Sequence, residues 1–222
     1  MSADKLTRLS PSSLNLFREC PRCFWLQMNA GIHRPSGPFP SLPGGMDGVI
    51  KKYFDTWRKK GELPPEIRTA VEGRLFDDDD TLKKWRNWRT GLSFEDSEAG
   101  GTLSGALDDC VLDNQKYSPL DYKTRGWAPK ENGHEFYQGQ LDAYSLLLKE
   151  NGYPESGIAY LVYYFPREVK DGGAVDFNVE VRKVKTSAQN ALKEFRKALE
   201  VLRNPLPLKH SACAFCSWGE GH

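Results

Sequence analysis

The sequence predicts a mixed α/β (α+β) fold, with one mixed sheet flanked by helices and a helical lobe at the N-terminus. Apolar residues recur at helical spacing through much of the first 90 residues. Short runs that alternate, or that are rich in Val, Leu and Tyr, fall between residues 91 and 184. Helical patterns return at 134–151, between the strand runs, and at 187–203, after them.

Length and composition fit one globular domain. The chain has 222 residues, of which 39% are hydrophobic and 27% charged, so it can bury a sizeable core. We divide it into an N-terminal helical region (1–90), a core (91–204) and a C-terminal cysteine segment (205–222). The net charge of +1, from 31 basic and 30 acidic residues, gives no overall basic signature for nucleic acid, although it is compatible with a local basic groove.

No run approaches the ~18 apolar residues of a membrane span, and the first residues lack an apolar signal core. We therefore expect a cytoplasmic protein with no membrane partner and with reduced thiols. In that compartment the five cysteines are more simply explained as metal ligands than as disulfides.

Helices are expected to dominate the N-terminal region. Ser10 caps the first helix and Pro11 occupies its first turn, and a second helical piece begins at Cys20-Pro21. The Pro- and Gly-rich residues 31–45 predict a loop. Further helices are predicted at 46–60, 66–74 and 81–89, with a break at 62–65.

The predicted helix at 81–89 interleaves basic and aromatic side chains: Lys83, Lys84, Arg86 and Arg89 with Trp85 and Trp88. Such a surface suits backbone phosphates and base stacking. The alternative is an ordinary amphipathic helix with its tryptophans in the core and its basic side in solvent. We favour core packing for each tryptophan and leave the phosphate role of the basic face open.

The strand region is organised around a hairpin with predicted arms at 102–113 and 117–124, after a short strand at 92–95. Asp113-Asn114-Gln115 forms the turn, because Asn and Asp tolerate positive φ. Beyond the hairpin, a helix at 134–151 carries Gln140 and Tyr144 on one face. The remaining predicted elements are a loop at 125–133, strands at 157–165 and 175–184 around a turn at 171–173, and a helix at 187–203.

Three side chains of the hairpin suggest chemistry. Asp121 and Lys123 are two residues apart and share a strand face, and Asp108 on the other arm can lie level with them. Two carboxylates, with the Tyr122 carbonyl between them, offer hard oxygen ligands for Mg²⁺ or Mn²⁺. A lysine beside the metal can orient or deprotonate a water aimed at a phosphate. For an isolated Asp-x-Lys, solvated charges on a hairpin edge are the simpler explanation.

The order of the motifs favours the chemical explanation, because it resembles the RecB-like branch of the PD-(D/E)XK nuclease superfamily. The motifs are Gly105-x-x-Asp108, Asp121-Tyr-Lys123-Thr and Gln140-Leu-Asp-Ala-Tyr144. The resemblance implies a restriction-endonuclease-like core, metal binding by the two aspartates, a catalytic lysine, and a positioning role for Gln140 and Tyr144. It also implies a single-stranded DNA exonuclease. Our candidate nucleic-acid contacts are the basic residues of the helix at 81–89, together with Thr124 and Arg125.

Two Cys-x-x-Cys clips lie at opposite ends of the chain: Cys20 with Cys23, and Cys213 with Cys216. Four thiolates suffice for a tetrahedral Zn²⁺ or an iron–sulfur cluster, and either would hold the termini together. The fifth cysteine, Cys110, is expected to be a packed thiol.

The segment Ser10-Pro-Ser-Ser-Leu-Asn-Leu-Phe-Arg-Glu-Cys20-Pro-Arg resembles the opening of many RecB-like nucleases. A subgroup that includes the CRISPR-associated exonuclease closes the domain with a [4Fe–4S] cluster, held by one N-terminal and three C-terminal cysteines. The two-and-two arrangement here departs from that pattern. The resemblance therefore implies a [4Fe–4S] cluster and leaves Zn²⁺ open.

A second departure concerns a histidine that many members carry on the helix before the core, after a glycine. Here Asp47, within Gly44-Gly-Met-Asp-Gly48, stands at that place. A carboxylate can bind the metal as well, and it can also cap a helix. Both explanations stay open.

The sequence thus predicts a Mg²⁺- or Mn²⁺-dependent deoxyribonuclease. One alternative is a non-catalytic DNA-binding or assembly subunit, which the near-neutral charge and the missing histidine motivate. Another is a protein-interaction domain held together by zinc. Protein partners in a CRISPR or repair complex are implied by the resemblance alone.

Overall fold

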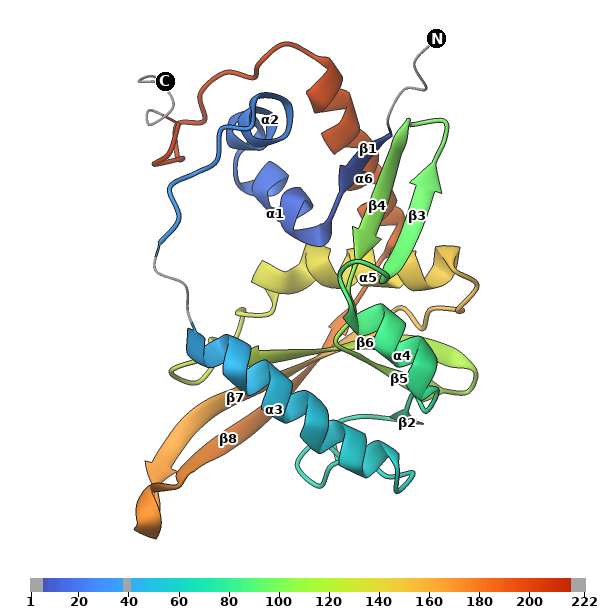
Figure 1. Cartoon of the computed structure of the whole chain (residues 1–222), viewed down its shortest axis with the longest axis vertical. Coiled ribbons are helices and arrows are strands. Elements are labelled where there is room, and N and C mark those ends of the chain that lie inside the picture. Colours follow the sequence, from blue (N-terminus) through green and yellow to red (C-terminus); the bar gives the residue numbers. More distant parts are fainter. Residues whose placement is uncertain (1–5, 38–40, 217–222) are drawn as a thin grey trace.

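The structure is a computed structural model that describes residues 6–37 and 41–216. It confirms the mixed α/β class, with two sheets and helices on both sides of the larger one (Figure 1). The helices are α1 (Pro11–Glu19), α2 (Pro21–Ala30), α3 (Ser41–Arg58), α4 (Asp79–Arg86), α5 (Gln138–Glu150) and α6 (Ala188–Arg203), with 3-10 turns η1 (Glu135–Tyr137) and η2 (Asp171–Gly173). The strands are β1 (Thr7–Leu9), β2 (Arg74–Leu75), β3 (Leu92–Asp96), β4 (Gly101–Gly105), β5 (Asp109–Asp113), β6 (Lys116–Thr124), β7 (Ile158–Val169) and β8 (Val175–Lys185).

The larger sheet has five strands in the order β2-β5-β6-β7-β8. Strands β6 and β7 run parallel, and the other neighbouring pairs run antiparallel. The chain passes from β6 to β7 through α5, the kind of crossover that a parallel pair requires. Strands β7 and β8 continue past the rest of the sheet as a long hairpin (Figure 1).

Helices α3 and α5 cover opposite faces of this sheet (Figure 1). On the α3 face, Phe54 packs on Tyr122 with the ring centroids 4.7 Å apart. Because side chains alternate along a strand, Asp121 and Lys123 turn to the α5 face. The predicted placement of these two residues on one face, away from Tyr122, is confirmed.

The β5–β6 hairpin has the predicted turn. Asn114 and Gln115 adopt φ values of 46° and 63°, and positive φ at both central residues suits the twist of a two-residue hairpin loop. Asp109 pairs with Leu120 at the open end of the hairpin, so the residue before β5 lies beside the part of β6 that carries Asp121.

The prediction of one continuous strand at 102–113 is wrong. The chain forms β4 in the small sheet and β5 in the large sheet, with a break at 106–108. Backbone groups in the break bond to α4 instead of a strand: the Leu107 N–H donates to the Trp85 carbonyl at 2.9 Å, and the Asp108 carbonyl accepts from Arg86 at 2.7 Å. Asp108 therefore directly precedes β5 and does not lie on a strand.

Two helix predictions also need correction. Residues 41–45 belong to α3 and not to the predicted loop; Pro43 is tolerated there because the N–H groups of the first turn lack intrahelical partners. Residues 66–74 form turns and the start of β2, not a helix. Gly73, with φ 96°, packs so close to Leu112 that an added Cβ would lie 2.6 Å from the Leu112 carbonyl oxygen.

The N-terminal lobe combines α1, α2, α6 and a small sheet in the order β1-β4-β3. Ser10 caps α1 as predicted, and the chain turns at Cys20 into α2. The segment after α6 returns to α2, where Trp25 donates to the Asn204 carbonyl at 2.9 Å and Arg22 to the Pro207 carbonyl at 2.9 Å. The two ends of the described chain are thus joined at one side of the molecule.

Candidate active site and cysteine cluster

Asp121 and Lys123 form an ion pair on β6, with 2.5 Å between Oδ2 and Nζ. The Asp121 carboxylate is 1% exposed, so it lies almost entirely away from water. Its Oδ2 has no aligned hydrogen-bond donor among the described residues. A buried carboxylate oxygen with unused lone pairs is a ready acceptor for a cation.

Gln140, in the first turn of α5, links the pair to the helix. Its Nε2 donates to Asp121 Oδ1 at 3.1 Å and to the Tyr144 hydroxyl at 2.8 Å, and its Oε1 accepts from Lys123 at 3.3 Å. The Lys123 ammonium also lies 4.5 Å from the centroid of the Tyr137 ring, a cation–π distance. These contacts hold the Lys123 ammonium between Asp121, Gln140 and the Tyr137 ring.

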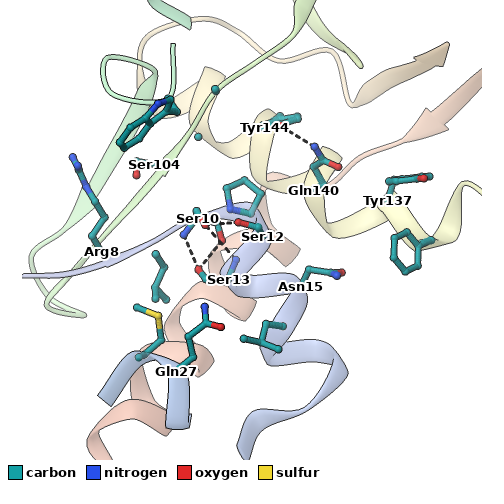
Figure 2. A pocket seen from close by; sticks show the side chains of 18 residues that line it. Arg8, Ser10, Ser12, Ser13, Asn15, Gln27, Ser104, Tyr137, Gln140 and Tyr144 are labelled. Atoms are coloured by element: carbon teal, nitrogen blue, oxygen red, sulfur yellow. Dashed lines mark hydrogen bonds between the residues drawn. The ribbon is translucent and has the colours of Figure 1, made fainter. Parts of the chain in front are cut away.

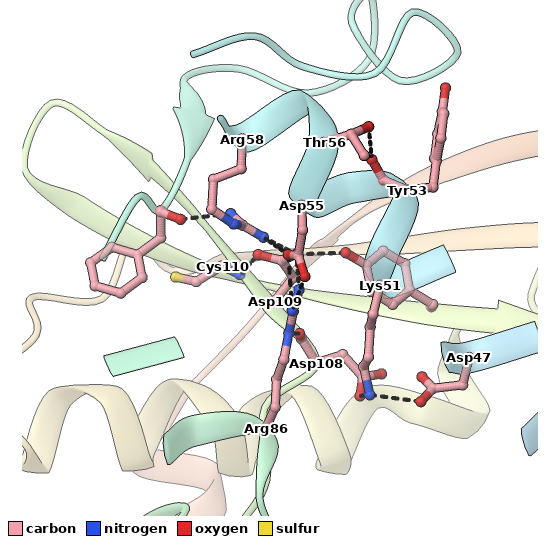
Figure 3. A network of polar contacts seen from close by, with 12 residues as sticks. Asp47, Lys51, Tyr53, Asp55, Thr56, Arg58, Arg86, Asp108, Asp109 and Cys110 are labelled. Atoms are coloured by element: carbon pink, nitrogen blue, oxygen red, sulfur yellow. Dashed lines mark hydrogen bonds and ion pairs between the residues drawn. The ribbon is translucent and has the colours of Figure 1, made fainter. Parts of the chain in front are cut away.

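Lys51 of α3 bridges two further acids. Its Nζ lies 2.8 Å from Asp47, one turn earlier, and 2.8 Å from Asp108 (Figure 3). Asp47 is in the interior of α3, so the idea that it caps this helix is wrong. Sequence reasoning missed Lys51, and its spacing of four from Asp47 was the available signal.

Three carboxyl groups, of Asp47, Asp108 and Asp121, face two ammonium groups, of Lys51 and Lys123. Burial raises the pKa of Asp121 to about 7; Lys123 opposes this shift, and the nearby Asp108 charge adds to it. Burial lowers the pKa of Lys51, but Asp108 and Asp47 together outweigh it and raise that pKa. Carboxylates held close together with too few cations are the setting in which a divalent ion binds.

A buried charge network lies behind Asp108. Asp109 is fully buried and accepts from Arg58 at 2.6 Å, from Arg86 at 2.9 Å and from the Tyr122 hydroxyl at 2.6 Å (Figure 3). Arg86 also makes two bonds of 2.9 Å to Asp55. The Tyr122 side chain therefore belongs to this network, while a metal-binding role of its carbonyl stays a prediction.

The predicted basic face of α4 divides in two. Arg86 is engaged in the internal network and is not an exposed phosphate contact, because its partners lie beneath the helix. Lys83, Lys84 and Arg89 are exposed, and Thr124 and Arg125 are half-buried at the end of β6. Trp85 is in the core as predicted, whereas Trp88 is 76% exposed, contrary to the prediction.

The four cysteines of the two clips meet in space. All four Sγ atoms lie within 4.8 Å of one another; Cys20 and Cys216 are 3.4 Å apart, and Cys23 and Cys213 are 3.6 Å apart. The His210 N–H donates to Cys216 Sγ at 3.2 Å, and Arg34 donates to Cys213 Sγ at 3.6 Å. Burial opposes ionisation of Cys213, but hydrogen bonds from the Phe215 N–H and the neighbouring thiols lower its pKa to about 7.

Cys110 lies outside this group. It is fully buried in the main core, with its thiol 3.6 Å from the Val111 carbonyl. Burial raises its pKa well above the usual value. The prediction of a packed thiol is confirmed.

A family model of the PD-(D/E)XK nuclease superfamily matches residues 8–220. The chain belongs to the PD-(D/E)XK nuclease superfamily. No curated protein matches it significantly. Membership implies a nuclease with a nucleic acid substrate, and members are typically metal-dependent phosphodiesterases.

The residues that the sequence predicts for the site fall in one region of this chain. Asp121, Lys123, Gln140 and Tyr144 are joined by hydrogen bonds and an ion pair, and Asp108 approaches from the break before β5. The break at 106–108 leaves Asp108 near enough to Asp121 for its charge to raise the pKa of Asp121. None of the described helices has the length and apolarity needed to cross a bilayer.

Proposed function

We propose that the chain is a metal-dependent DNA nuclease that hydrolyses phosphodiester bonds at Asp121 and Lys123. The observation that carries the proposal is the buried carboxylate of Asp121, which shares Gln140 with the lysine beside it. Superfamily membership supports the reaction class.

Asp108 and Asp121 are the proposed protein ligands of Mg²⁺ or Mn²⁺, with the Tyr122 carbonyl and Asp47 as further candidates. The donor set fits such an ion, since it consists of carboxylate and carbonyl oxygens and includes the buried Asp121 carboxylate, whose ion-pair partner is Lys123. A bound divalent ion would supply charge to the scissile phosphate and lower the pKa of a coordinated water.

Lys123 is proposed to hold the attacking water and to offset charge on the phosphate. Gln140 keeps the ammonium close to Asp121 by accepting from Nζ at 3.3 Å. Tyr144 in turn accepts from the Gln140 amide at 2.8 Å, which fixes the orientation of that amide. Gln140 and Tyr144 are therefore positioning residues in this proposal.

Single-stranded DNA and exonuclease polarity are the finer part of the proposal and come from the RecB-like motif order. The test is cleavage of 5′- and 3′-labelled single-stranded DNA with Mn²⁺, in wild type, Asp121→Ala and Lys123→Ala. Both variants should lose at least about a hundredfold in rate, the usual contribution of a positioned acid–base group. Lys149→Ala, an exposed lysine in the last turn of α5, is the matched control and should cleave normally. Undiminished cleavage by Lys123→Ala would sink the assignment.

A second candidate is a DNA-binding or assembly subunit without catalysis. The observation that favours it is Lys51, whose ammonium already forms ion pairs with both Asp47 and Asp108, at 2.8 Å each. DNA binding by the wild type without cleavage in Mg²⁺ or Mn²⁺ would support this candidate over the nuclease.

We further propose that the cysteine cluster holds a structural metal that joins the termini. A single zinc bonded to thiolates at about 2.3 Å separates tetrahedral sulfurs by roughly 3.8 Å, by geometry from the same bond length. Two of the sulfur pairs, at 3.4 Å and 3.6 Å, are close to that spacing, and all four sulfurs lie within 4.8 Å of one another. A [4Fe–4S] cluster places iron and sulfide between its thiolates and needs them farther apart, so the spacing favours Zn²⁺ over the cluster that the resemblance implies.

A further inference from the structure

A cavity of about 850 Å³ lies beside the proposed active site, between α1, β4 and the start of α5 (Figure 2). It reaches the site itself, because Gln140 and Tyr144 line it. Tyr137 also lines the cavity, and the Lys123 ammonium lies 4.5 Å from the centroid of its ring. A ligand in this cavity would therefore end next to Asp121 and Lys123.

Two aromatic side chains of the cavity are left uncovered by the fold. Trp88 is 76% exposed and Phe136 is 64% exposed. Trp85, only three residues before Trp88, is buried, and Trp127, which is 72% exposed, does not line the cavity. Large aromatic surfaces left open in a concave site are typical of ligand contacts.

The charges around these rings favour an anionic ligand. Arg8 lines the cavity, and the Arg89 guanidinium lies 5.0 Å from the centroid of the Trp88 ring. The neighbouring Lys84 is exposed as well. Aromatic rings flanked by cationic side chains are the combination that binds unpaired bases and their phosphates.

We propose that this cavity binds single-stranded nucleic acid by stacking unpaired bases on Trp88 and Phe136, and so leads the strand to the active site. This rests on the proposed nuclease function and names the side chains that would hold the single strand proposed as its substrate. In a duplex the base faces are already stacked on one another, so a duplex cannot use these rings. A cavity of this size accommodates a small ligand or a short stretch of strand.

The test is binding of a short labelled oligothymidylate, followed by fluorescence anisotropy without added Mg²⁺ or Mn²⁺. Trp88→Ala and Phe136→Ala should each weaken binding roughly 5- to 100-fold, the range expected for losing one base–aromatic stack. Trp88→Phe keeps a ring and should bind within a few-fold of wild type. Both side chains are exposed, so the folded state should survive, as thermal melting will show.

An abasic strand of the same length separates stacking from other effects. It should bind wild type and Trp88→Ala equally, because no base remains to stack. Wild-type affinity in both alanine variants, or an equal loss with the abasic strand, would overturn the proposal. Since the assay needs no cleavage, a wild type that cleaves while Trp88→Ala binds normally would refute only this inference. A wild type that binds through Trp88 without cleaving would refute only the nuclease.

Discussion

At the scale of single residues, the proposed chemistry depends on a carboxylate placed where its charge is costly. Asp121 is 1% exposed and its only ion-pair partner among the described residues is Lys123. Burial raises its pKa to about 7, against the pull of the lysine. In the absence of a divalent ion the group is therefore partly protonated near neutral pH. A cation and a proton compete for the same oxygen.

This competition predicts the pH dependence of metal binding. Because the pKa of Asp121 is raised to about 7, Mn²⁺ must displace a proton from this carboxyl group below that pH. The affinity for Mn²⁺ should therefore decrease by up to about tenfold for each pH unit that the pH is lowered below about 7. Above that pH the carboxylate is ionised and the dependence should flatten. Calorimetric titration of Mn²⁺ between about pH 5.5 and about pH 8 checks it.

Asp121→Asn should bind Mn²⁺ more weakly and with a shallower pH slope. Asp80→Asn alters an exposed acid of α4 and should match wild type throughout. A wild-type affinity that does not change across the range would mean that Asp121 is not a ligand.

At the scale of elements, local patterns predicted β6 well and the approach to β5 poorly. The two-residue spacing of Asp121 and Lys123, and the four-residue spacing of Gln140 and Tyr144, are properties of one strand and one helix. The break at 106–108 depends on Arg86 and Trp85 of α4, which take up backbone groups of Asp108 and Leu107. Such a contact between distant segments leaves no periodic signal in either one.

The structural role of Arg86 could not be predicted from the sequence either, because it too depends on contacts between distant segments. Its basic neighbours on α4 suggested an exposed face, but its partners Asp55 and Asp109 lie 31 and 23 residues away. Asp109 directly follows Asp108 but belongs to none of the motifs that the sequence analysis identified. Buried networks of this kind become visible only when the elements that carry their members are packed together.

The network predicts that alanine substitution of Arg86 lowers the free energy of unfolding far more than alanine substitution of Arg89. Arg86→Ala should lower the free energy of unfolding by about 3 kcal/mol, because it removes a partner of a fully buried carboxylate. It should also slow cleavage per folded molecule, since Arg86 holds the Asp108 carbonyl at 2.7 Å. Urea unfolding measures the first effect and the labelled-strand assay the second.

Arg89→Ala is the matched control for stability, because Arg89 is exposed and its loss should cost no more than about 0.5 kcal/mol. Equal stability of the two variants would contradict the structural role of Arg86.

At the scale of the whole molecule, the cysteine cluster closes the chain on itself. Hydrogen bonds from α2 already hold the segment after α6, and the four thiols meet beyond it. This closure could be predicted from sequence because both clips carry their own signature, unlike Lys51 or Asp109. The distances between the sulfurs, on which the proposal of one ion rather than a cluster rests, could not be predicted in this way.

The closing prediction concerns that metal. Purified without oxygen, the protein should contain about one zinc per chain and little iron, since four thiolates complete a tetrahedral site. Cys23→Ser or Cys213→Ser should lose the ion and lower the melting temperature, because metal binding is coupled to folding in such sites. Cys110→Ala, which alters the one cysteine outside the cluster, should keep full metal content. Elemental analysis and thermal melting provide the readouts. Stoichiometric iron with visible absorbance would instead establish the iron–sulfur cluster, and would require the four sulfurs to move apart when it binds.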